Sequence, residues 1–206
     1  MNNGIQVVIF DCDGVLFDSM KANTAYYNRI LNRFGRPPMN DAETARAQMQ
    51  TADEVIAMLF SDPRTFKAAQ DFRAEMGYEP FIELMEMAPD LKPVLSRLRK
   101  RFRTAIATNR ADTMARVLTV FDLSADFDLV VTSLDVQRPK PHPDELLKVL
   151  DHFGVGPETA LYVGDSPIDQ DAARAAGMSF VAFANPALDA DHHITRMDQL
   201  ASILDA

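Results

Sequence analysis

The chain has a single cysteine, Cys12, so no disulfide bond can form within it. Scarce cysteine is typical of proteins that work in the reducing cytosol. The sequence also lacks any hydrophobic run as long as a membrane span, and its N-terminus lacks the charged region of a signal peptide. We therefore expect a cytoplasmic protein that does not insert into a membrane.

Positive charge is also scarce, because 21 lysines and arginines stand against 30 aspartates and glutamates and give a net charge of −9. This balance argues against nucleic acid or an anionic membrane as a partner. The basic residues between Lys92 and Arg103 are better explained as the solvated face and basic last turn of one helix. The four histidines show no metal-ligand spacing, so we assign them to the surface or to packing.

Hydrophobic residues make up 47% of the sequence, which is enough for an ordinary folded core. Five short apolar runs are typical of strands buried on both faces: Gln6–Phe10, Thr104–Thr108, Leu129–Ser133, Ala160–Gly164 and Phe180–Phe183. Helical periodicity occupies residues 112–120, 144–153 and 169–176, and a last amphipathic helix spans 197–204. Strands that alternate with helices predict an α/β fold with a Rossmann-like parallel sheet and right-handed crossovers.

The interval between the first two strands shows no strand pattern from residue 18 to about residue 87. It shows helical patterns instead, at residues 21–34, 41–60, 64–76 and 79–87. An all-helical block of this size is too long for a crossover and predicts an insertion after the first strand. We expect a core of residues 1–17 and 88–206, a helical domain of residues 18–87, and hinges near residues 17–20 and 87–91.

Seven of the eleven methionines fall within this helical segment. Methionine adapts to changing neighbours, so a mobile lid that faces a substrate would use it. A small helical core filled with flexible side chains would use it as well. The sequence leaves both interpretations open.

Two aspartates, Asp11 and Asp13, directly follow the first predicted strand and precede Gly14. Ligands of open α/β sheets bind just outside the carboxyl ends of the strands. Two like charges this close are unfavourable unless a cation or a shared proton relieves them, which indicates a metal site or acid–base chemistry. An ordinary Asp-Gly turn is the alternative. The side chain of Cys12 should point away from both aspartates, so we interpret it as a packing residue.

Further polar residues follow the other predicted strands. Thr108 ends the second strand, Lys140 follows the third within a proline-rich loop, and Asp165 and Asp169 follow the fourth. Each has an ordinary structural explanation, as a capping residue, a solvated lysine or acids at a helix N-terminus. Together with the first two aspartates they suit phosphoryl transfer, which needs a hard divalent cation, a nucleophile and donors that neutralise the phosphoryl charge.

This set of motifs resembles the haloacid dehalogenase-like hydrolase superfamily, in the branch of phosphoglycolate phosphatase and β-phosphoglucomutase. That branch shows D-x-D-G-[VT]-[LI]-x-D-[ST], then a [ST]-N pair, then Lys-Pro, then G-D-[ST]-x-x-D. The chain carries these motifs at residues 11–19, 108–109, 140–141 and 164–169. By this resemblance the helical insertion corresponds to the cap domain of that branch.

The resemblance implies a role for each motif residue. Asp11 would be the nucleophile and Asp13 the general acid/base. Thr108 and the backbone of Asn109 would bind the phosphoryl oxygens, and Lys140 would hold the phosphoryl group and the nucleophile in place.

The same resemblance implies Mg²⁺ as the cofactor. Asp11, the backbone carbonyl of Asp13 and Asp165 would bind the ion, and Asp169 would support it directly or through water. Arg110 departs from the family pattern, because its position often carries lysine or a small residue. It would either contact an anionic leaving group or face solvent.

The resemblance therefore implies a Mg²⁺-dependent phosphatase that acts on a small phosphorylated metabolite, phosphoglycolate-like or a sugar phosphate, through an aspartyl-phosphate. Dehalogenases of the superfamily lack an aspartate at the position of Asp13, so its presence indicates phosphate ester chemistry. A sugar-phosphate mutase would use the same residues, and a catalytically silent binding protein could share the fold. Neither the substrate nor the oligomeric state follows from the sequence.

Overall fold

The computed structural model describes residues 4–205. Its main sheet contains β1 (Val7–Phe10), β4 (Arg103–Thr108), β5 (Leu129–Thr132), β6 (Ala160–Gly164), β7 (Ser179–Phe183) and β8 (His192–Ile194). All neighbouring strands are parallel, and their spatial order is β5-β4-β1-β6-β7-β8. The five predicted strands are confirmed with small shifts at their ends, whereas β8 was not predicted, because it is short and carries two exposed histidines.

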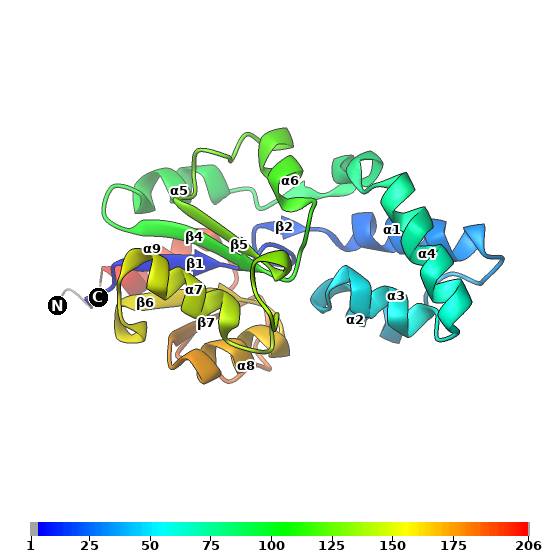
Figure 1. Cartoon of the computed structure of the whole chain (residues 1–206). Coiled ribbons are helices and arrows are strands. Elements are labelled where there is room, and N and C mark those ends of the chain that lie inside the picture. The colour runs from blue at the N-terminus through cyan, green and yellow to red at the C-terminus, as the bar shows by residue number, and fades with distance from the viewer. Residues whose placement is uncertain (1–3, 206) are drawn as a thin grey trace.

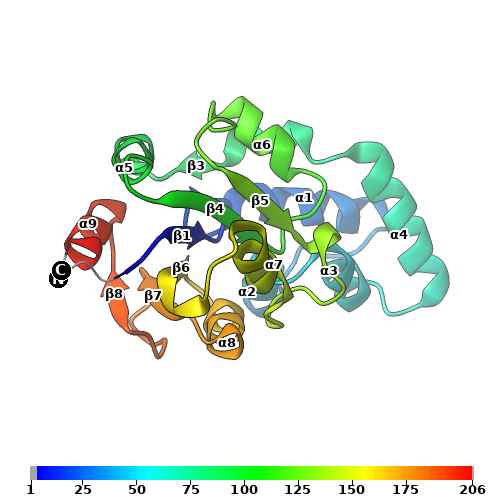
Figure 2. The same cartoon turned by 60° about the vertical axis from the view of Figure 1, so that its left-hand side comes forward.

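Helices cover both faces of the sheet and make a three-layer α/β core (Figure 2). One face packs against α5 (Leu91–Leu98), α6 (Met114–Val120) and α9 (Leu200–Leu204), and the other packs against α7 (Asp144–Phe153) and α8 (Pro167–Ala176). Alternate residues of β1 enter opposite faces, so Val8 belongs to the first hydrophobic cluster and Val7 to the second. The predicted α/β class is therefore confirmed.

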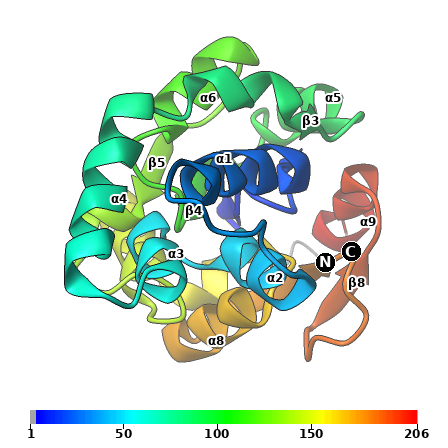
Figure 3. The same cartoon turned by 90° about the vertical axis from the view of Figure 1, so that its right-hand side faces the viewer.

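The segment between β1 and β4 is helical, as predicted, and lies beyond the end of the sheet (Figure 1). It contains α1 (Met20–Arg33), α2 (Asp41–Met49), α3 (Ala52–Leu59), α4 (Pro63–Met76) and a 3₁₀ helix at Glu79–Leu84. We call these five helices the cap. Figure 3 looks onto the cap, with α1 across its middle.

The prediction of one continuous helix over residues 41–60 is wrong. Helix α2 ends at Met49, and Thr51 begins α3 by accepting a hydrogen bond from the backbone of Glu54, whose side chain accepts one from the backbone of Thr51. In this reciprocal capping box, two backbone N–H groups at the start of the new helix each gain a hydrogen-bond acceptor.

Two short strands join the cap to the core, where no strand was predicted. Strand β2 (Phe17–Asp18) pairs antiparallel with β3 (Glu86–Met87), and an exposed ion pair joins Lys21 to Glu86. The two chain crossings therefore lie side by side, at or next to the predicted hinge regions. The division of the chain at residues 17/18 and 87/88 stays a prediction.

Most methionines of this segment are packing residues. Met85 is buried, and Met39, Met58, Met76 and Met87 pack against the hydrophobic core. Cys12 is likewise fully buried in that core, as expected of a packing residue. No helix within residues 4–205 combines the length and the apolar character that crossing a membrane requires.

The packing of α5 on the sheet should contribute strongly to stability. Leu95 of α5 is fully buried, so we expect Leu95→Ala to lower the free energy of unfolding by about 2–5 kcal/mol through lost burial and a residual cavity. Urea denaturation followed by circular dichroism measures this loss. Leu147→Ala is the matched control, because this leucine of α7 is 45% exposed. Equal losses in the two variants would contradict the assigned packing.

Candidate active site

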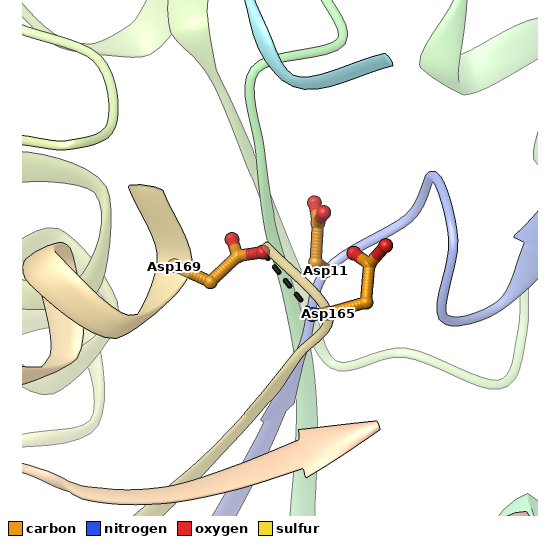
Figure 4. A group of neighbouring side chains, drawn as sticks. All are labelled: Asp11, Asp165 and Asp169. Atoms are coloured by element: carbon orange, nitrogen blue, oxygen red, sulfur yellow. Dashed lines mark hydrogen bonds between the residues drawn. The ribbon is translucent and has the colours of Figure 1, made fainter. Parts of the chain in front are cut away.

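The predicted site residues of β1, β4 and β6 meet at the carboxyl edge of the sheet. Asp11 directly follows β1, and its backbone N–H donates to Val163 of β6 over 2.9 Å. Asp165 directly follows β6, and Thr108 is the last residue of β4. Figure 4 shows the carboxylates of Asp11 and Asp165 pointing the same way from these neighbouring strands. The parallel register thus assembles groups that are far apart in the sequence.

Lys140 reaches into the middle of these acids from the loop between β5 and α7. Its ammonium nitrogen lies 2.8 Å from Asp11 Oδ1 and 2.7 Å from Asp169 Oδ1. It also donates to the hydroxyl of Tyr162 over 2.9 Å and to the carbonyl of Ala107 over 3.2 Å. Only 2% of Lys140 is exposed, so the solvated-lysine interpretation is wrong.

Burial and charge shift the pKa values of this cluster. Burial would lower the pKa of Lys140, but the charges of Asp11 and Asp169 outweigh it and hold the pKa well above the usual range. Burial raises the pKa of Asp11 to about 7, against the opposing charge of Lys140. For Asp169, the ammonium and several hydrogen bonds overcome the effect of burial and lower the pKa. The lysine is therefore a fixed cation beside these two acids.

Asp169 is held by both of its oxygens. Oδ1 accepts from Lys140 and, over 2.7 Å, from the hydroxyl of Tyr162, while Oδ2 accepts from the side chain and backbone N–H of Ser166. Ser166 caps α8 in return. The sequence analysis assigned no role to Tyr162, or to Ser166 within the motif at residues 164–169. The S-x-x-D pattern at the start of α8 signals the cap, and a tyrosine within a buried strand signals the need for a hydroxyl partner.

The carboxylates of Asp11, Asp165 and Asp169 form the one group of three potential metal-ligating side chains among the described residues, with ligand oxygens within 4.8 Å of one another. Burial, followed by the charges of Asp11 and Asp169, raises the pKa of Asp165 to about 8. These carboxylates outnumber the cations beside them, and each offers an oxygen ligand. Such a set fits a hard divalent ion.

Gly14 makes room for this arrangement. Its φ of +82° is a left-handed conformation, and a Cβ at this position would lie 2.1 Å from Asp165 Oδ2. Any side chain here would therefore collide with the carboxylate of Asp165.

The second aspartate of the opening motif is paired with Arg110. The guanidinium donates to Asp13 through Nη2 over 2.6 Å and through Nε over 3.1 Å, which is a bidentate ion pair. It also lies over the ring of Tyr78 in the cap, 4.7 Å from the ring centroid. The side chain of Arg110 is only 5% exposed, so the alternative that it faces solvent is wrong.

Thr108 contacts the backbone of Arg110, and Asn109 contacts the backbone of Lys140. The Thr108 hydroxyl accepts from the backbone N–H of Arg110 over 3.2 Å. The Asn109 amide donates to the carbonyl of Met49 over 2.9 Å and to that of Lys140 over 3.1 Å. Asn109 therefore links the cap to the lysine loop.

A cavity of about 120 Å³ lies between the core and the cap. The core lines it with Asp11, Asp13, Thr108, Asn109, Arg110 and Lys140 among others. The cap contributes Asn23, Gln48, Gln50, Arg73 and Tyr78 among others. The sequence analysis identified none of these cap residues, because helical periodicity does not show which residues face the site.

Comparison with known proteins identifies this architecture. The sequence model of the family described as haloacid dehalogenase-like hydrolase matches residues 8–183. The chain belongs to this family. The resemblance inferred from the motifs is thereby confirmed.

Individual relatives agree with this assignment. A crystal structure of a haloacid dehalogenase-superfamily hydrolase from Geobacter sulfurreducens is 39% identical, with a TM-score of 0.80 over 98% of this chain and 97% of that chain. A phosphoglycolate phosphatase from Photorhabdus laumondii is 31% identical over 84% of this chain and 78% of its own. A β-phosphoglucomutase from Clostridium difficile, 17% identical with a TM-score of 0.86 over 98% and 96% of the two chains, shows the shared fold alone.

Charge repulsion within the acidic cluster of this haloacid dehalogenase-like hydrolase can be measured. We expect Asp165→Asn to raise the melting temperature in EDTA at pH 8 by about 2–4 °C, because it removes a carboxyl group whose ionisation burial and two neighbouring acids make unfavourable. Differential scanning fluorimetry measures the shift. Asp151→Asn, at an exposed position of α7, is the control with the same charge change. An equal rise in the control, or a fall in the first variant, would contradict the repulsion.

Proposed function

We propose that this hydrolase is a Mg²⁺-dependent phosphatase that hydrolyses a small phosphorylated metabolite through an aspartyl-phosphate on Asp11. One observation carries the proposal: Asp11 opens onto the cavity between core and cap while Lys140 lies 2.8 Å from its carboxylate and Asp13 lines the same cavity. The relatives named phosphoglycolate phosphatase support the phosphate ester chemistry.

In the first step, a carboxylate oxygen of Asp11 attacks phosphorus and the bond to the leaving oxygen breaks. Lys140 favours the ionised form of this carboxylate and holds it in place, and the Thr108 hydroxyl and Asn109 backbone N–H would bind the phosphoryl oxygens. Asp13 protonates the leaving oxygen as it departs, so one of its two contacts with Arg110 must open to let it carry the proton. In the second step, Asp13 accepts a proton from the water that attacks the aspartyl-phosphate, which restores Asp11 and releases phosphate.

The acidic cluster suits the divalent ion that this chemistry needs. Asp11, Asp165 and the backbone carbonyl of Asp13 would hold it. We assign Asp169 a contact through water, because both of its oxygens already accept hydrogen bonds from protein groups. When bound, Mg²⁺ supplies positive charge that offsets the charge of the phosphoryl group.

The main alternative is a sugar-phosphate mutase, which would use the same two aspartates. Incubation with a β-hexose 1-phosphate and a bisphosphate primer separates the two activities. A 6-phosphate product without free phosphate would refute the phosphatase. A catalytically silent protein is disfavoured, since it has no need of crowded, mutually repelling carboxylates.

We also propose a cytoplasmic location, which the single, buried cysteine supports.

Removal of divalent cations should abolish the activity. We expect phosphate release from a panel of phosphate esters to disappear in EDTA and to return on addition of Mg²⁺, because the site offers oxygen ligands only. A colorimetric phosphate assay follows both changes. Full activity in metal-free buffer would contradict the roles of Asp165 and Asp169, and absence of turnover across the whole panel with Mg²⁺ would favour the silent protein.

Two substitutions separate the proposed roles of Asp11 and Asp13. Asp11→Asn should form no covalent intermediate, because the attacking carboxylate is gone. Asp13→Asn should still be phosphorylated but should turn over about 10²–10⁴-fold more slowly, the usual contribution of general acid–base catalysis. Its loss should be smaller for p-nitrophenyl phosphate, whose leaving group needs little protonation.

Acid quenching after exposure to a substrate labelled on its phosphate traps label on the protein. Label retained by Asp11→Asn would disprove the nucleophile. An Asp13→Asn variant as fast as the wild type would remove Asp13 from the mechanism.

A further inference from the structure

The direction of the Asp13 side chain depends on Arg110. A β-bridge to Phe17 restrains the backbone at Asp13, but a backbone contact does not orient the carboxylate. Within residues 4–205, the hydrogen bonds to this carboxylate come from Arg110 alone, through Nη2 to Oδ1 over 2.6 Å and through Nε to Oδ2 over 3.1 Å. Two parallel bonds of this kind fix both the position and the plane of a carboxylate. Arg110 therefore sets where the carboxylate of Asp13 points.

Arg110 is itself held from both the core and the cap. Its Nη1 donates to Thr113 Oγ1 of the core over 3.1 Å. Its Nη2 reaches two acceptors of the cap, Tyr78 Oη over 3.4 Å and Asn23 Oδ1 over 3.5 Å. The Tyr78 hydroxyl donates to the same oxygen of Asn23 over 2.6 Å, so the two cap residues are fixed to each other. The cap thus helps to align the guanidinium.

The nitrogen of Arg110 that contacts the cap is also the one that holds Asp13 more closely. Nη2 makes the 2.6 Å bond to Oδ1, whereas the longer bond, from Nε, goes to Oδ2. One of the two bonds has to open when Asp13 carries a proton, and the longer bond is the weaker one. Opening it frees Oδ2 while Oδ1 stays bound to Nη2, so the side chain keeps its direction.

We infer that Arg110 is a positioning residue, which aims the carboxyl group of Asp13 at the leaving oxygen and is itself aligned by Tyr78 of the cap. This inference rests on the proposed function of Asp13 as the acid/base. All three guanidinium nitrogens already donate to Asp13 or Thr113, which explains the burial of Arg110 without a bound substrate. Contact with the phosphoryl group of the substrate is the competing role.

Two aryl esters that differ only in a nitro group test the inference in the Mg²⁺-loaded enzyme. Phenyl phosphate has the poorer leaving group, so it needs more help from a general acid than p-nitrophenyl phosphate does. We expect Arg110→Met to lower kcat/KM for phenyl phosphate about 10- to 100-fold, as the loss of hydrogen bonds to a charged group would, and to lower it less for p-nitrophenyl phosphate. Equal losses for the two esters would assign Arg110 to the phosphoryl group or to the fold and overturn the inference.

The same substitution in an Asp13→Asn background gives a second measurement. If Arg110 acts through Asp13, adding Arg110→Met to Asp13→Asn should change kcat/KM for phenyl phosphate less than about 2-fold, since the two effects are not independent. A further loss as large as the one in the wild-type background would overturn the inference.

Tyr78→Phe tests the part played by the cap, and it remains informative if Arg110→Met, which leaves Asp13 without its cation, does not fold. The substitution keeps the ring that lies against the guanidinium. Loss of the hydroxyl should lower kcat/KM for phenyl phosphate about 2- to 10-fold, and it should have no further effect in the Asp13→Asn background. The same loss in both backgrounds would overturn the inference.

Arg116→Met is the matched control for both variants. Arg116 of α6 pairs with Glu79 of the cap, so it also joins core to cap, but it is exposed and does not line the cavity. Its substitution should leave kcat/KM within about 2-fold of the wild type, as expected of an exposed ion pair. A loss as large as that of Tyr78→Phe would show that any contact between cap and core has this effect, and would overturn the inference.

Asp13→Asn alone separates this inference from the proposed function. A slow Asp13→Asn variant together with wild-type rates in Arg110→Met and Tyr78→Phe would leave the phosphatase standing and refute the positioning role. An Asp13→Asn variant as fast as the wild type, or no turnover of either ester by the wild type, would refute both.

Discussion

The buried ammonium of Lys140 is the interaction on which the rest of the site depends. It lies within 3 Å of Asp11 and Asp169, two carboxylates from different strand ends. Without this cation, burial would leave both acids to repel each other and Asp165 in a region of low dielectric constant. The lysine therefore allows three acids to converge, and that convergence orients the carboxylate of Asp11, the proposed nucleophile, and makes a place that suits a divalent ion.

Arg110 is a second buried cation of the site, and it joins the core to the cap. It pairs with Asp13, and it contacts Tyr78 and Asn23 in the cap. Asn109, the preceding residue, reaches the cap backbone at Met49. The loop after β4 thus connects the acid/base proposed for catalysis with the helices that close the cavity, so the position of the cap and the environment of Asp13 are physically linked.

Strong periodic patterns explain why much of the fold could be predicted. The buried strands show continuous apolar runs, and parallel strands place their carboxyl ends at one edge, so the acids at those ends had to come together. Weak or local signals explain the misses. Strands β2 and β3 have two residues each, which is too short to show an alternation of apolar and polar residues. The break between α2 and α3 was signalled only by the capping pattern from Thr51 to Glu54, within a sequence that otherwise favours helix.

The sequence by itself determined the α/β core, the helical insertion and the order of the polar motifs, because each depends on residues close together in the chain. Only the tertiary structure decided which groups pair. Asp13 and Arg110 are 97 positions apart, and Lys140 and Tyr162 are 22 apart. Tertiary packing also decided that the break after Met49 places Gln48 and Gln50 at the cavity. Local periodicity sets which face of a helix is apolar, but the packing of cap on core sets which polar residues meet the site.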